Sequence, residues 1–351
     1  MSKSYFRPEV DALAGYTPGE QPKMNDLIKL NTNENPYPPS PAVREVLNTT
    51  DIDLLRRYPD PTADPLRDAV AQRYGTSRDR VICGNGSDDL LTMIFRAFTS
   101  PELPLAMPKP AYSLYPVLAA MQGAKTIQVD LTADFDMPED FLEQAAGANL
   151  LAIPRPNAPT GRNIPREVME KICRNFDGIV LIDEAYADFA DDNCMDMALR
   201  FDNVIVMRTF SKSYSLAGLR LGYAVASPQI IDGLMKLKDS YNVNRLTQAV
   251  GLAAFNDTAY LEKTLAMVRA TRKRLCCELA KRGFKVVPSD ANFVFAAPPD
   301  SNGKAYFDAL RQQAVIVRYF AGADTGSYVR ITVGTDAEID RLLQVTDDYL
   351  K

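Results

Sequence analysis

The sequence predicts an α/β protein, with a large domain built on a mainly parallel sheet and a smaller α+β domain packed against it. At 351 residues, the chain exceeds what one hydrophobic core usually organises. Between about residues 43 and 248, short apolar runs alternate with helix-like stretches, which is typical of parallel strands covered by helices on both faces. We therefore expect an N-terminal arm over residues 1–41, the large domain over 42–248 and the small domain over 249–351.

The first 41 residues predict an extended arm with turns. They are rich in Pro, Gly, Asn and Tyr, as in GYTPGEQP and NTNENPYPPSP, and follow neither regular hydrophobic period. The opening residues contain no apolar core of a secretion signal, and no later stretch approaches the about 20 apolar residues that a membrane span needs. A cytoplasmic protein without a membrane partner is therefore expected.

The clearest buried strands of the large domain are the apolar runs 150–153, 179–182 and 204–207. Each run is continuous rather than alternating, as in strands buried on both faces. Polar sequence follows each run directly, in the order PRPNAPTG, DEAYADF and RTFSKSYSLAGLRLGY. Because ligands bind at the carboxyl ends of the strands in open α/β sheets, we expect these three segments to meet at one crevice.

The small domain follows a long helix that is predicted from about 246 to 282, where Leu261, Leu265 and Val268 recur at helical spacing. The remaining sequence predicts strands at 285–288, 292–295, 315–319 and 328–333, a helix near 303–313 and a C-terminal helix. Together these elements form the expected α+β domain.

The composition excludes several classes of function. Forty Lys and Arg against 45 Asp and Glu give a net charge of -5 without a basic tail, so nucleic acid is not an expected partner. The chain has no histidine, which removes Ser-His-Asp and Cys-His catalysis and most catalytic zinc sites. Its five cysteines lack the spacing of zinc or redox sites, so no metal is expected. The chemistry must use Lys, Asp, Tyr, Arg or a bound cofactor.

Lys212 is the first candidate catalytic residue. It follows the strand at 204–207, with hydroxyl groups on both sides and Arg220 eight residues later. Desolvation and nearby cations lower the pKa of an amine and favour a Schiff base with an aldehyde. Thr209, Ser211 and Arg220 supply hydrogen bonds and a guanidinium suited to a phosphate ester. An isolated Ser-Lys pair, by contrast, is more often a surface lysine beside a turn.

Asp183 is the second candidate, at the end of the apolar strand that leads into DEAY. An aspartate in this place would pair with the protonated ring nitrogen of pyridoxal phosphate, and the cationic ring then withdraws electrons from the substrate's Cα. Tyr186 in the same motif would hydrogen-bond the cofactor's phenolate oxygen. The competing interpretation is an aspartate that caps the next helix.

Ser87 and Asp88 form the third candidate group, in the glycine-rich turn CGNGSDD that precedes an apolar run. Helix N-termini present free N–H groups and positive potential to phosphate, so these two residues would donate backbone N–H groups to it. Both are also good N-cap residues, and the motif alone favours that structural role.

Taken together, the segments resemble the fold-type I pyridoxal-phosphate-dependent aminotransferases, and at closer range the histidinol-phosphate aminotransferase family. The resemblance covers nearly the whole chain. It is carried by GYTPGEQP, KLNTNENPYPPSP, RYPDP, GNGSDD, PKPAYSLYP, PNAPTG, DEAY, TFSKSYSLAGLRLGY and YVRITVGT. The lysine block with its Arg-Leu-Gly is highly specific when DEAY precedes it at this distance, whereas GNGSDD and PNAPTG are individually modest.

The resemblance implies a role for each matching residue. Lys212 would carry pyridoxal 5'-phosphate and then move the proton at the substrate's Cα. Tyr112 would stack on the pyridine ring. Tyr58 would reach the cofactor phosphate of a partner subunit, so a homodimer with shared active sites is expected. The residues expected to contact substrate are Tyr16, Asn35, Arg318 and Arg330, of which the two arginines would anchor its anionic groups.

The chain departs from the family pattern in one loop. PRPNAPTG has Ala158 where many relatives have a second asparagine, which leaves Asn157 for the contact to the cofactor's phenolate oxygen. The sequence assigns no role to Arg155 in the same loop.

The activity that the resemblance implies is transamination between L-histidinol phosphate and 2-oxoglutarate, with glutamate as the other amino acid. An aminotransferase for phenylalanine and tyrosine is a close alternative, because the same pocket must accept a flat ring. A pyridoxal-phosphate lyase such as threonine-phosphate decarboxylase shares the lysine block. A regulator that only senses cofactor would need an added DNA-binding domain, for which an arm of about 40 residues is too short.

Overall fold

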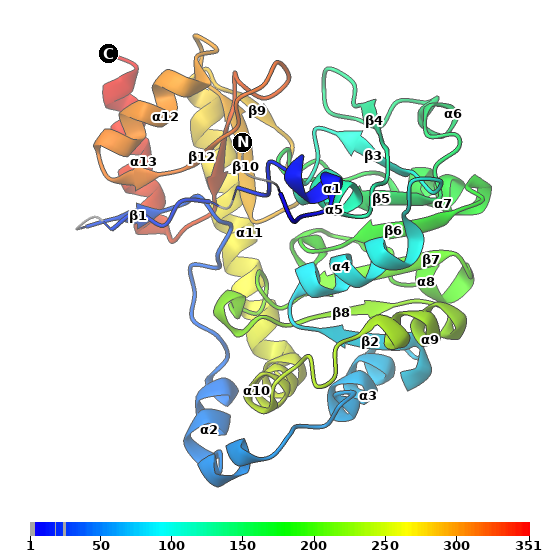
Figure 1. The fold of residues 1–351 in the computed structure, drawn as a ribbon. Helices are drawn as coiled ribbons and strands as arrows, with labels where there is room; N and C mark the ends of the chain where they lie inside the picture. The colour runs from blue at the N-terminus through cyan, green and yellow to red at the C-terminus, as the bar shows by residue number, and fades with distance from the viewer. Residues whose placement is uncertain (1–3, 18, 24–25) are drawn as a thin grey trace.

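The computed structural model describes residues 4–17, 19–23 and 26–351, and its centre is a seven-stranded sheet (Figure 1). The strand order is β2-β8-β7-β6-β5-β3-β4. Neighbouring strands are parallel except at β8, which runs antiparallel to both β2 and β7. The predicted mainly parallel sheet is thus confirmed. Its strands are β2 Val81–Gly84, β3 Leu105–Lys109, β4 Thr126–Asp130, β5 Leu150–Pro154, β6 Ile179–Asp183, β7 Val204–Thr209 and β8 Gly222–Val225.

Helices cover both faces of this sheet. Successive strand residues point to opposite faces, so Val180 and Ile182 of β6 pack into one core and Leu181 packs into the other. The first core contains side chains of α3 (Asp64–Arg73), α7 (Arg166–Asn175) and α10 (Arg245–Asn256). The second contains side chains of α4 (Ser87–Phe98), α5 (Leu114–Met121) and α9 (Pro228–Leu237). Two short helices, α6 (Phe141–Gln144) and α8 (Met197–Arg200), complete the layers.

The three predicted buried strands are present, and each runs further at its carboxyl end than predicted. They end at Pro154, Asp183 and Thr209. Asp183 and Thr209 are therefore the last residues of their strands, where the sheet holds their backbones in place.

The prediction of a single long helix over about 246–282 is wrong. The structure has two helices, α10 and α11 (Thr258–Lys281), and Asp257 between them is not helical. Asp257 has φ -85° and ψ 69°, and its carboxylate accepts a hydrogen bond from the Tyr260 N–H and contacts the Ser40 hydroxyl. The side chain thus caps the start of α11. A break of one residue leaves the hydrophobic period almost unchanged, which is why the sequence pattern did not reveal it.

The small domain is an antiparallel sheet of order β12-β13-β10-β9, packed against α11, α12 and α13. The strand predicted over 315–319 is two strands in different sheets, because β11 pairs in parallel with β1 of the arm while β12 pairs with β13. The elements are β1 Ile28–Lys29, β9 Lys285–Val287, β10 Phe293–Ala297, α12 Gly303–Gln312, β11 Val315–Ile316, β12 Arg318–Tyr319, β13 Val329–Thr332 and α13 Asp336–Tyr349.

The arm is less extended than predicted. Besides β1 it forms the short helix α1 (Pro8–Asp11), and α2 (Pro41–Thr49) begins where the arm ends. Figure 1 shows α2 projecting from the body of the molecule. Single turns of 3-10 helix lie at 52–56, 78–80, 187–189 and 217–219. No helix within the described residues has the length and apolar character needed to cross a membrane.

Phe135 joins the two parts of the molecule. It belongs to the loop between β4 and α6, yet its ring packs edge-on against Phe295 and Tyr328 of the small domain, at centroid distances of 5.8 and 5.5 Å. Its φ of 62° lies in the left-handed region that favours glycine. The packing of the buried ring therefore offsets an unfavourable backbone conformation.

Candidate functional site

A cavity of about 620 Å³ lies at the carboxyl ends of β5, β6 and β7, between the sheet, the small domain and the arm. This is the crevice that the three polar segments predicted. Most of the residues singled out in the sequence line it, namely Tyr16, Ser87, Asp88, Tyr112, Asp183, Tyr186, Thr209, Ser211, Lys212, Arg220, Arg318 and Arg330. Asn35, Tyr58 and Asn157 lie outside its lining.

Lys212 is one of the residues that line this cavity. Its Nζ donates to the backbone oxygen of Thr32 at 3.2 Å and lies 5.9 Å from the centre of the Tyr186 ring. The Asn35 amide donates to the backbone oxygens of Lys212 and Ser213, each at 3.2 Å. Asn35 therefore holds the lysine segment from outside the cavity lining, and its predicted contact to substrate remains a prediction.

One end of the cavity is formed by the start of α4. The N-cap of this helix is Gly86, at φ 90°, so Ser87 and Asp88 are its first helical residues and not the caps that the structural alternative required. Their N–H groups belong to the first turn, where no intrahelical partner exists. Arg220 lies beside them, with Nη2 3.2 Å from the Asp88 carboxylate and Nη1 3.4 Å from the Ser211 hydroxyl.

Two glycines keep this end of the cavity open. A Cβ on Gly86 would lie 2.6 Å from Nη2 of Arg220, and a Cβ on Gly222 would lie 2.8 Å from the backbone nitrogen of Ser87. At Gly222 the neighbour is backbone, which cannot move aside as the end of the Arg220 side chain can, and at Gly86 the φ of 90° itself favours glycine. The result is a cradle of helix N–H groups, hydroxyls and one guanidinium without bulky groups, which fits a phosphate ester.

Besides a site for its phosphate, pyridoxal phosphate needs a carboxylate that pairs with the protonated ring nitrogen. Asp183 meets this requirement. It is 6% exposed, and it accepts hydrogen bonds from the Tyr115 hydroxyl at 2.7 Å and the Ala185 N–H at 3.1 Å. Burial raises the pKa of Asp183 to about 6, while the two hydrogen bonds act to lower it. Asp183 caps no helix, since its bonded N–H belongs to the turn that follows β6.

The side-chain hydrogen-bond partners of Asp183 and Tyr186 were not found from the sequence. Tyr115 lies in PKPAYSLYP, one helical turn after Tyr112, but nothing in that spacing shows that it faces Asp183. Asn33 donates from its amide to the Tyr186 hydroxyl at 2.9 Å, across 153 residues of chain. Such partners come from distant segments, so only the fold reveals them.

Tyr112 lies between two other tyrosines. Its ring meets Tyr115 edge-on at 5.5 Å and Tyr16 edge-on at 5.9 Å. Burial raises the pKa of Tyr112 well above its ordinary value, so the phenol stays neutral. Tyr112 thus offers the cavity an uncharged aromatic side chain, as a stacking partner for a cofactor ring requires.

Arg318 and Arg330 approach the cavity from the small domain and share one aromatic neighbour. Their guanidinium carbons lie 5.5 and 5.3 Å from the centre of the Phe320 ring. Arg330 donates from Nη2 to the backbone oxygen of Asn31 at 2.9 Å, whereas its buried Nε has no partner among the described residues. Burial lowers the pKa of Arg330. An anion would satisfy both the charge and the unpaired N–H.

Asn157 is buried behind the cavity. Its amide nitrogen donates to the Pro110 oxygen and the Thr160 hydroxyl, both at 3.0 Å, and its Oδ1 has no partner among the described residues. Ala158 lines the cavity in its place. The predicted contact of Asn157 to the cofactor remains a prediction.

Arg155 now has a structural explanation. It is fully buried, donates from Nε to the Ile164 oxygen at 2.7 Å and pairs through Nη2 with Asp192 at 2.7 Å. Arg155 therefore fastens the PRPNAPTG loop to the segment after β6.

Tyr58 does not line this chain's own cavity. It is 76% exposed and stacks on Tyr241 at a centroid distance of 4.4 Å. Its side chain is thus largely exposed, in the segment that follows α2.

Comparisons with known proteins agree with this geometry. Residues 25–345 match the family model described as aminotransferase class I and II. A histidinol-phosphate aminotransferase of Synechocystis is 44% identical over 338 residues, which are 96% of each chain. The chain belongs to the histidinol-phosphate aminotransferase family. The resemblance stated from the motifs is thereby confirmed.

Further family members support the same assignment. A histidinol-phosphate aminotransferase from Bordetella parapertussis is 44% identical and covers 97% of each chain. The crystal structure of histidinol-phosphate aminotransferase from Sinorhizobium meliloti, in complex with pyridoxal 5'-phosphate, superposes with a TM-score of 0.90 at 26% identity and covers 99% of this chain and 98% of that one. The fold-type I architecture and the aminotransferase class are therefore confirmed for this family member.

Proposed function

We propose that this protein is a pyridoxal-phosphate-dependent aminotransferase that moves an amino group between L-histidinol phosphate and 2-oxoglutarate. The observation that carries the proposal is one cavity that brings together Lys212, the buried carboxylate of Asp183 and a phosphate cradle at the start of α4. When bound, pyridoxal phosphate supplies an aldehyde and an electron-withdrawing ring. The residues present fit each of its groups.

Each residue then has a defined task. Lys212 would attach the cofactor and would afterwards move the proton at the substrate's Cα. Asp183 would hold the ring nitrogen protonated, and Tyr112 would stack on the ring. Tyr186 would hydrogen-bond the phenolate oxygen, and Asn157 would do so only after its amide nitrogen leaves the Pro110 oxygen or the Thr160 hydroxyl. The residues that would hold the phosphate line the same end of the cavity, namely Ser87, Asp88, Thr209, Ser211 and Arg220.

The substrate side rests on the small-domain arginines. Arg330 and Arg318 suit an anionic substrate such as a phosphate monoester or a dicarboxylate, which are the two partners of the proposed reaction. Tyr16 and Phe320 line the same region and offer aromatic surface to a flat ring. The relatives are named for histidinol phosphate, which selects this substrate among ring-bearing amines.

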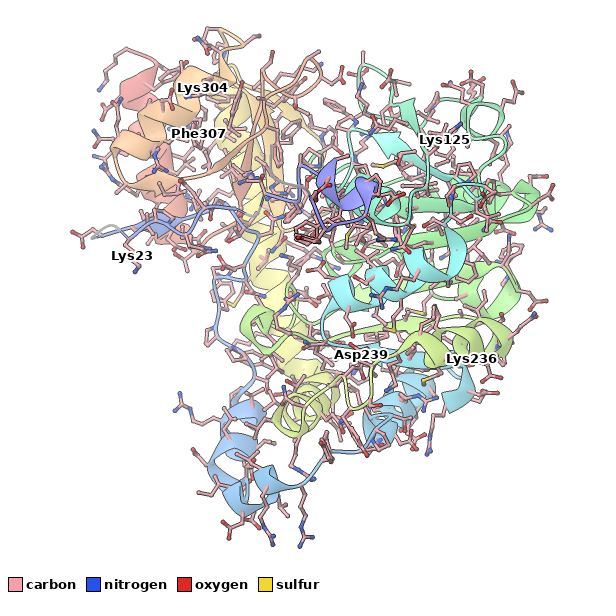
Figure 2. All side chains as sticks on the ribbon, viewed as in Figure 1. Lys23, Lys125, Lys236, Asp239, Lys304 and Phe307 are labelled. Carbon is pink, nitrogen blue, oxygen red and sulfur yellow. The ribbon has the colours of Figure 1, made fainter. Side chains whose placement is uncertain are left out.

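The attachment of the cofactor is tested by spectrum and by peptide mapping. Purified protein with added pyridoxal phosphate is expected to be yellow, and borohydride reduction is expected to label the peptide that contains Lys212. Lys212→Ala should retain no label and lose at least about 100-fold in turnover. Lys236→Ala is the matched control, since Lys236 is an exposed lysine on α9 (Figure 2). A label on any lysine other than Lys212 would contradict the proposal.

The substrate is tested by comparing histidinol phosphate with phenylalanine, each with 2-oxoglutarate. We expect a higher kcat/KM for histidinol phosphate, because only this substrate carries a dianion for the two arginines. Turnover of phenylalanine alone would favour the aromatic alternative. Release of carbon dioxide without a keto acid would favour a lyase.

We further propose a homodimer in the cytoplasm. The projecting segment around α2 exposes apolar side chains that a second copy would cover, namely Leu47, Ile52, Leu55 and Tyr58. Cys83, Cys173 and Cys194 are buried free thiols, which suits a reducing compartment.

Light scattering is expected to give twice the chain mass for the wild type. Ile52→Asp should shift the protein toward the monomer and reduce activity, because Tyr58 then loses its partner site.

A further inference from the structure

Tyr115 lies against the carboxylate of Asp183 without lining the cavity itself. It belongs to α5, is fully buried and donates its hydroxyl to Oδ2 of Asp183 at 2.7 Å. Its ring is held by Phe95, stacked at 6.0 Å, and by Tyr112, edge-on at 5.5 Å. The hydroxyl therefore has a fixed direction toward one oxygen.

We propose that Tyr115 is a positioning residue that keeps Asp183 ionised and oriented for the protonated ring nitrogen of the cofactor. This inference rests on the proposed function and concerns the same site. A phenol that donates to a carboxylate stabilises its ionised form. It also occupies a lone pair of Oδ2, while the Ala185 N–H occupies one of Oδ1, so rotation of the carboxylate would break both bonds.

The charges around Asp183 explain why such help is needed. Burial and the nearby carboxylates of Asp88, from α4, and Glu184, from its own segment, all raise the pKa of Asp183. Arg208 of β7 neutralises Glu184 through a bond of 2.7 Å. The groups that favour the ionised form are Tyr115 and the Ala185 N–H.

The other groups near the pair do not replace this hydrogen bond. Burial raises the pKa of Tyr115 well above its ordinary value, and the Asp183 carboxylate, Tyr112 and Tyr186 add to this, which keeps the Tyr115 hydroxyl a proton donor. Lys212 and Arg220 line the same cavity. Both are committed elsewhere, Lys212 to the Thr32 oxygen and Arg220 to the Asp88 carboxylate.

The consequence is a pH dependence of cofactor affinity. Asp183 pairs with the ring nitrogen only as a carboxylate, so the affinity should fall as the pH drops through the pKa of Asp183. Loss of one hydrogen bond to the charged form raises that pKa by about one unit. Tyr115→Phe keeps the ring packing and removes only the donor. Its affinity midpoint should therefore move to higher pH by about one unit.

The experiment measures the dissociation constant of pyridoxal phosphate between pH 5.5 and 8.5 from the absorbance of the bound cofactor. Tyr115→Phe should bind about fivefold more weakly than the wild type at pH 6 and within about twofold at pH 8.5. Tyr306→Phe is the matched control, because Tyr306 is equally buried and its hydroxyl makes a 2.7 Å bond to Thr346, in the small-domain core. This control should leave the midpoint unchanged.

A double-mutant cycle separates positioning from general destabilisation. In an Asp183→Asn background, no carboxylate remains to titrate, so adding Tyr115→Phe should change the affinity by less than about twofold at every pH. A second probe retains the donor: 3-fluorotyrosine at position 115 is more acidic, donates more strongly and should move the midpoint to lower pH. This probe decides the question even if Tyr115→Phe does not fold.

The outcomes distinguish the two proposals. Absence of bound cofactor in the wild type at every pH would overturn the proposed function. Normal binding by the wild type together with an unmoved midpoint in Tyr115→Phe, or an equal effect of that substitution in the Asp183→Asn background, would overturn the role of Tyr115 alone.

Discussion

At the scale of single residues, burial shields the Asp183 carboxylate from water. It also makes ionisation of this carboxylate costly in the cofactor-free protein. Its pKa is raised from 3.8 to about 6 by the fold. For an acid whose folded pKa is raised, the contribution to stability is fully present below the unfolded pKa and is lost as the pH rises through the folded pKa. The cofactor's cationic ring would remove this cost.

Cofactor-free protein should therefore lose stability from this group on going from acid to neutral pH. Relative to Asp183→Asn, which cannot titrate, the wild-type free energy of unfolding should fall by about 1 kcal/mol between pH 5 and pH 7.5. Urea denaturation of both proteins at the two pH values measures it. If the difference in free energy of unfolding between wild type and Asp183→Asn is the same at both pH values, or shifts in favour of the wild type at pH 7.5, the pKa of Asp183 is not raised.

Arg330 provides a second prediction for a single residue. Arg330→Lys keeps the charge but loses the guanidinium fork, so kcat/KM for histidinol phosphate should fall by about 10- to 100-fold through the loss of one charged hydrogen bond. The absorbance of bound cofactor should not change. Arg174→Lys is the control, since Arg174 is an exposed arginine on α7. Steady-state kinetics of both variants test this prediction. An unaltered kcat/KM in Arg330→Lys would show that Arg330 does not bind the substrate.

At the scale of elements, the site depends on how closely β8 approaches the start of α4. Gly222 is the first residue of β8, and its neighbours are backbone atoms of Gly86, Ser87 and Arg208. Backbone cannot move aside as a flexible side chain can. The phosphate cradle is therefore built by a strand-to-turn contact that only glycine permits.

Gly222→Ala should consequently destabilise the protein by about 1–3 kcal/mol and weaken cofactor binding, because the new Cβ pushes against the Ser87 nitrogen. Gly218→Ala is the matched control four residues earlier, since a Cβ on Gly218 meets no atom within 4 Å. Thermal unfolding with and without pyridoxal phosphate compares the two. Equal behaviour of the two variants would mean that the strand can shift at no cost.

At the scale of the whole molecule, the substrate arginines and the cofactor residues belong to different parts that must be held together. Phe135, from the large domain, packs in one cluster with Val287, Phe295, Ala297 and Tyr328 of the small domain, and Phe320 packs against that cluster. Phe320 is also the ring beside Arg318 and Arg330. The cluster thus connects the loop after β4 with the substrate end of the cavity.

Phe135→Ala should lower the free energy of unfolding by about 3 kcal/mol and raise KM for the anionic substrate, since the small domain loses its main apolar contact to that loop. The cofactor spectrum should be preserved. Phe307→Ala is the control. Phe307 lies with Lys304 on α12, at the outer side of the small domain, and is half-buried (Figure 2). This substitution should lower the free energy of unfolding by about 1 kcal/mol and leave KM unchanged. An unchanged KM in Phe135→Ala would separate the cluster from substrate binding.

The sequence by itself determined the features of this protein that depend on residues close together in the chain. Buried strands are continuous apolar runs, and polar residues at their carboxyl ends must share one edge of the sheet. That is why Lys212, Asp183 and Thr209 could be assigned to one site without coordinates. The α/β architecture and the helices α12 and α13 followed from such patterns, whereas the family followed from the resemblance of the motifs.

The tertiary structure alone decided the contacts between segments that are far apart in the chain. Tyr115 against Asp183, Asn35 against the lysine backbone and Phe135 inside the small domain join positions separated by 68 or more residues. The break at Asp257 was equally invisible, because one capping residue leaves the hydrophobic period intact. Periodicity reports which face of an element is buried, but it does not report which side chain of another element lies opposite.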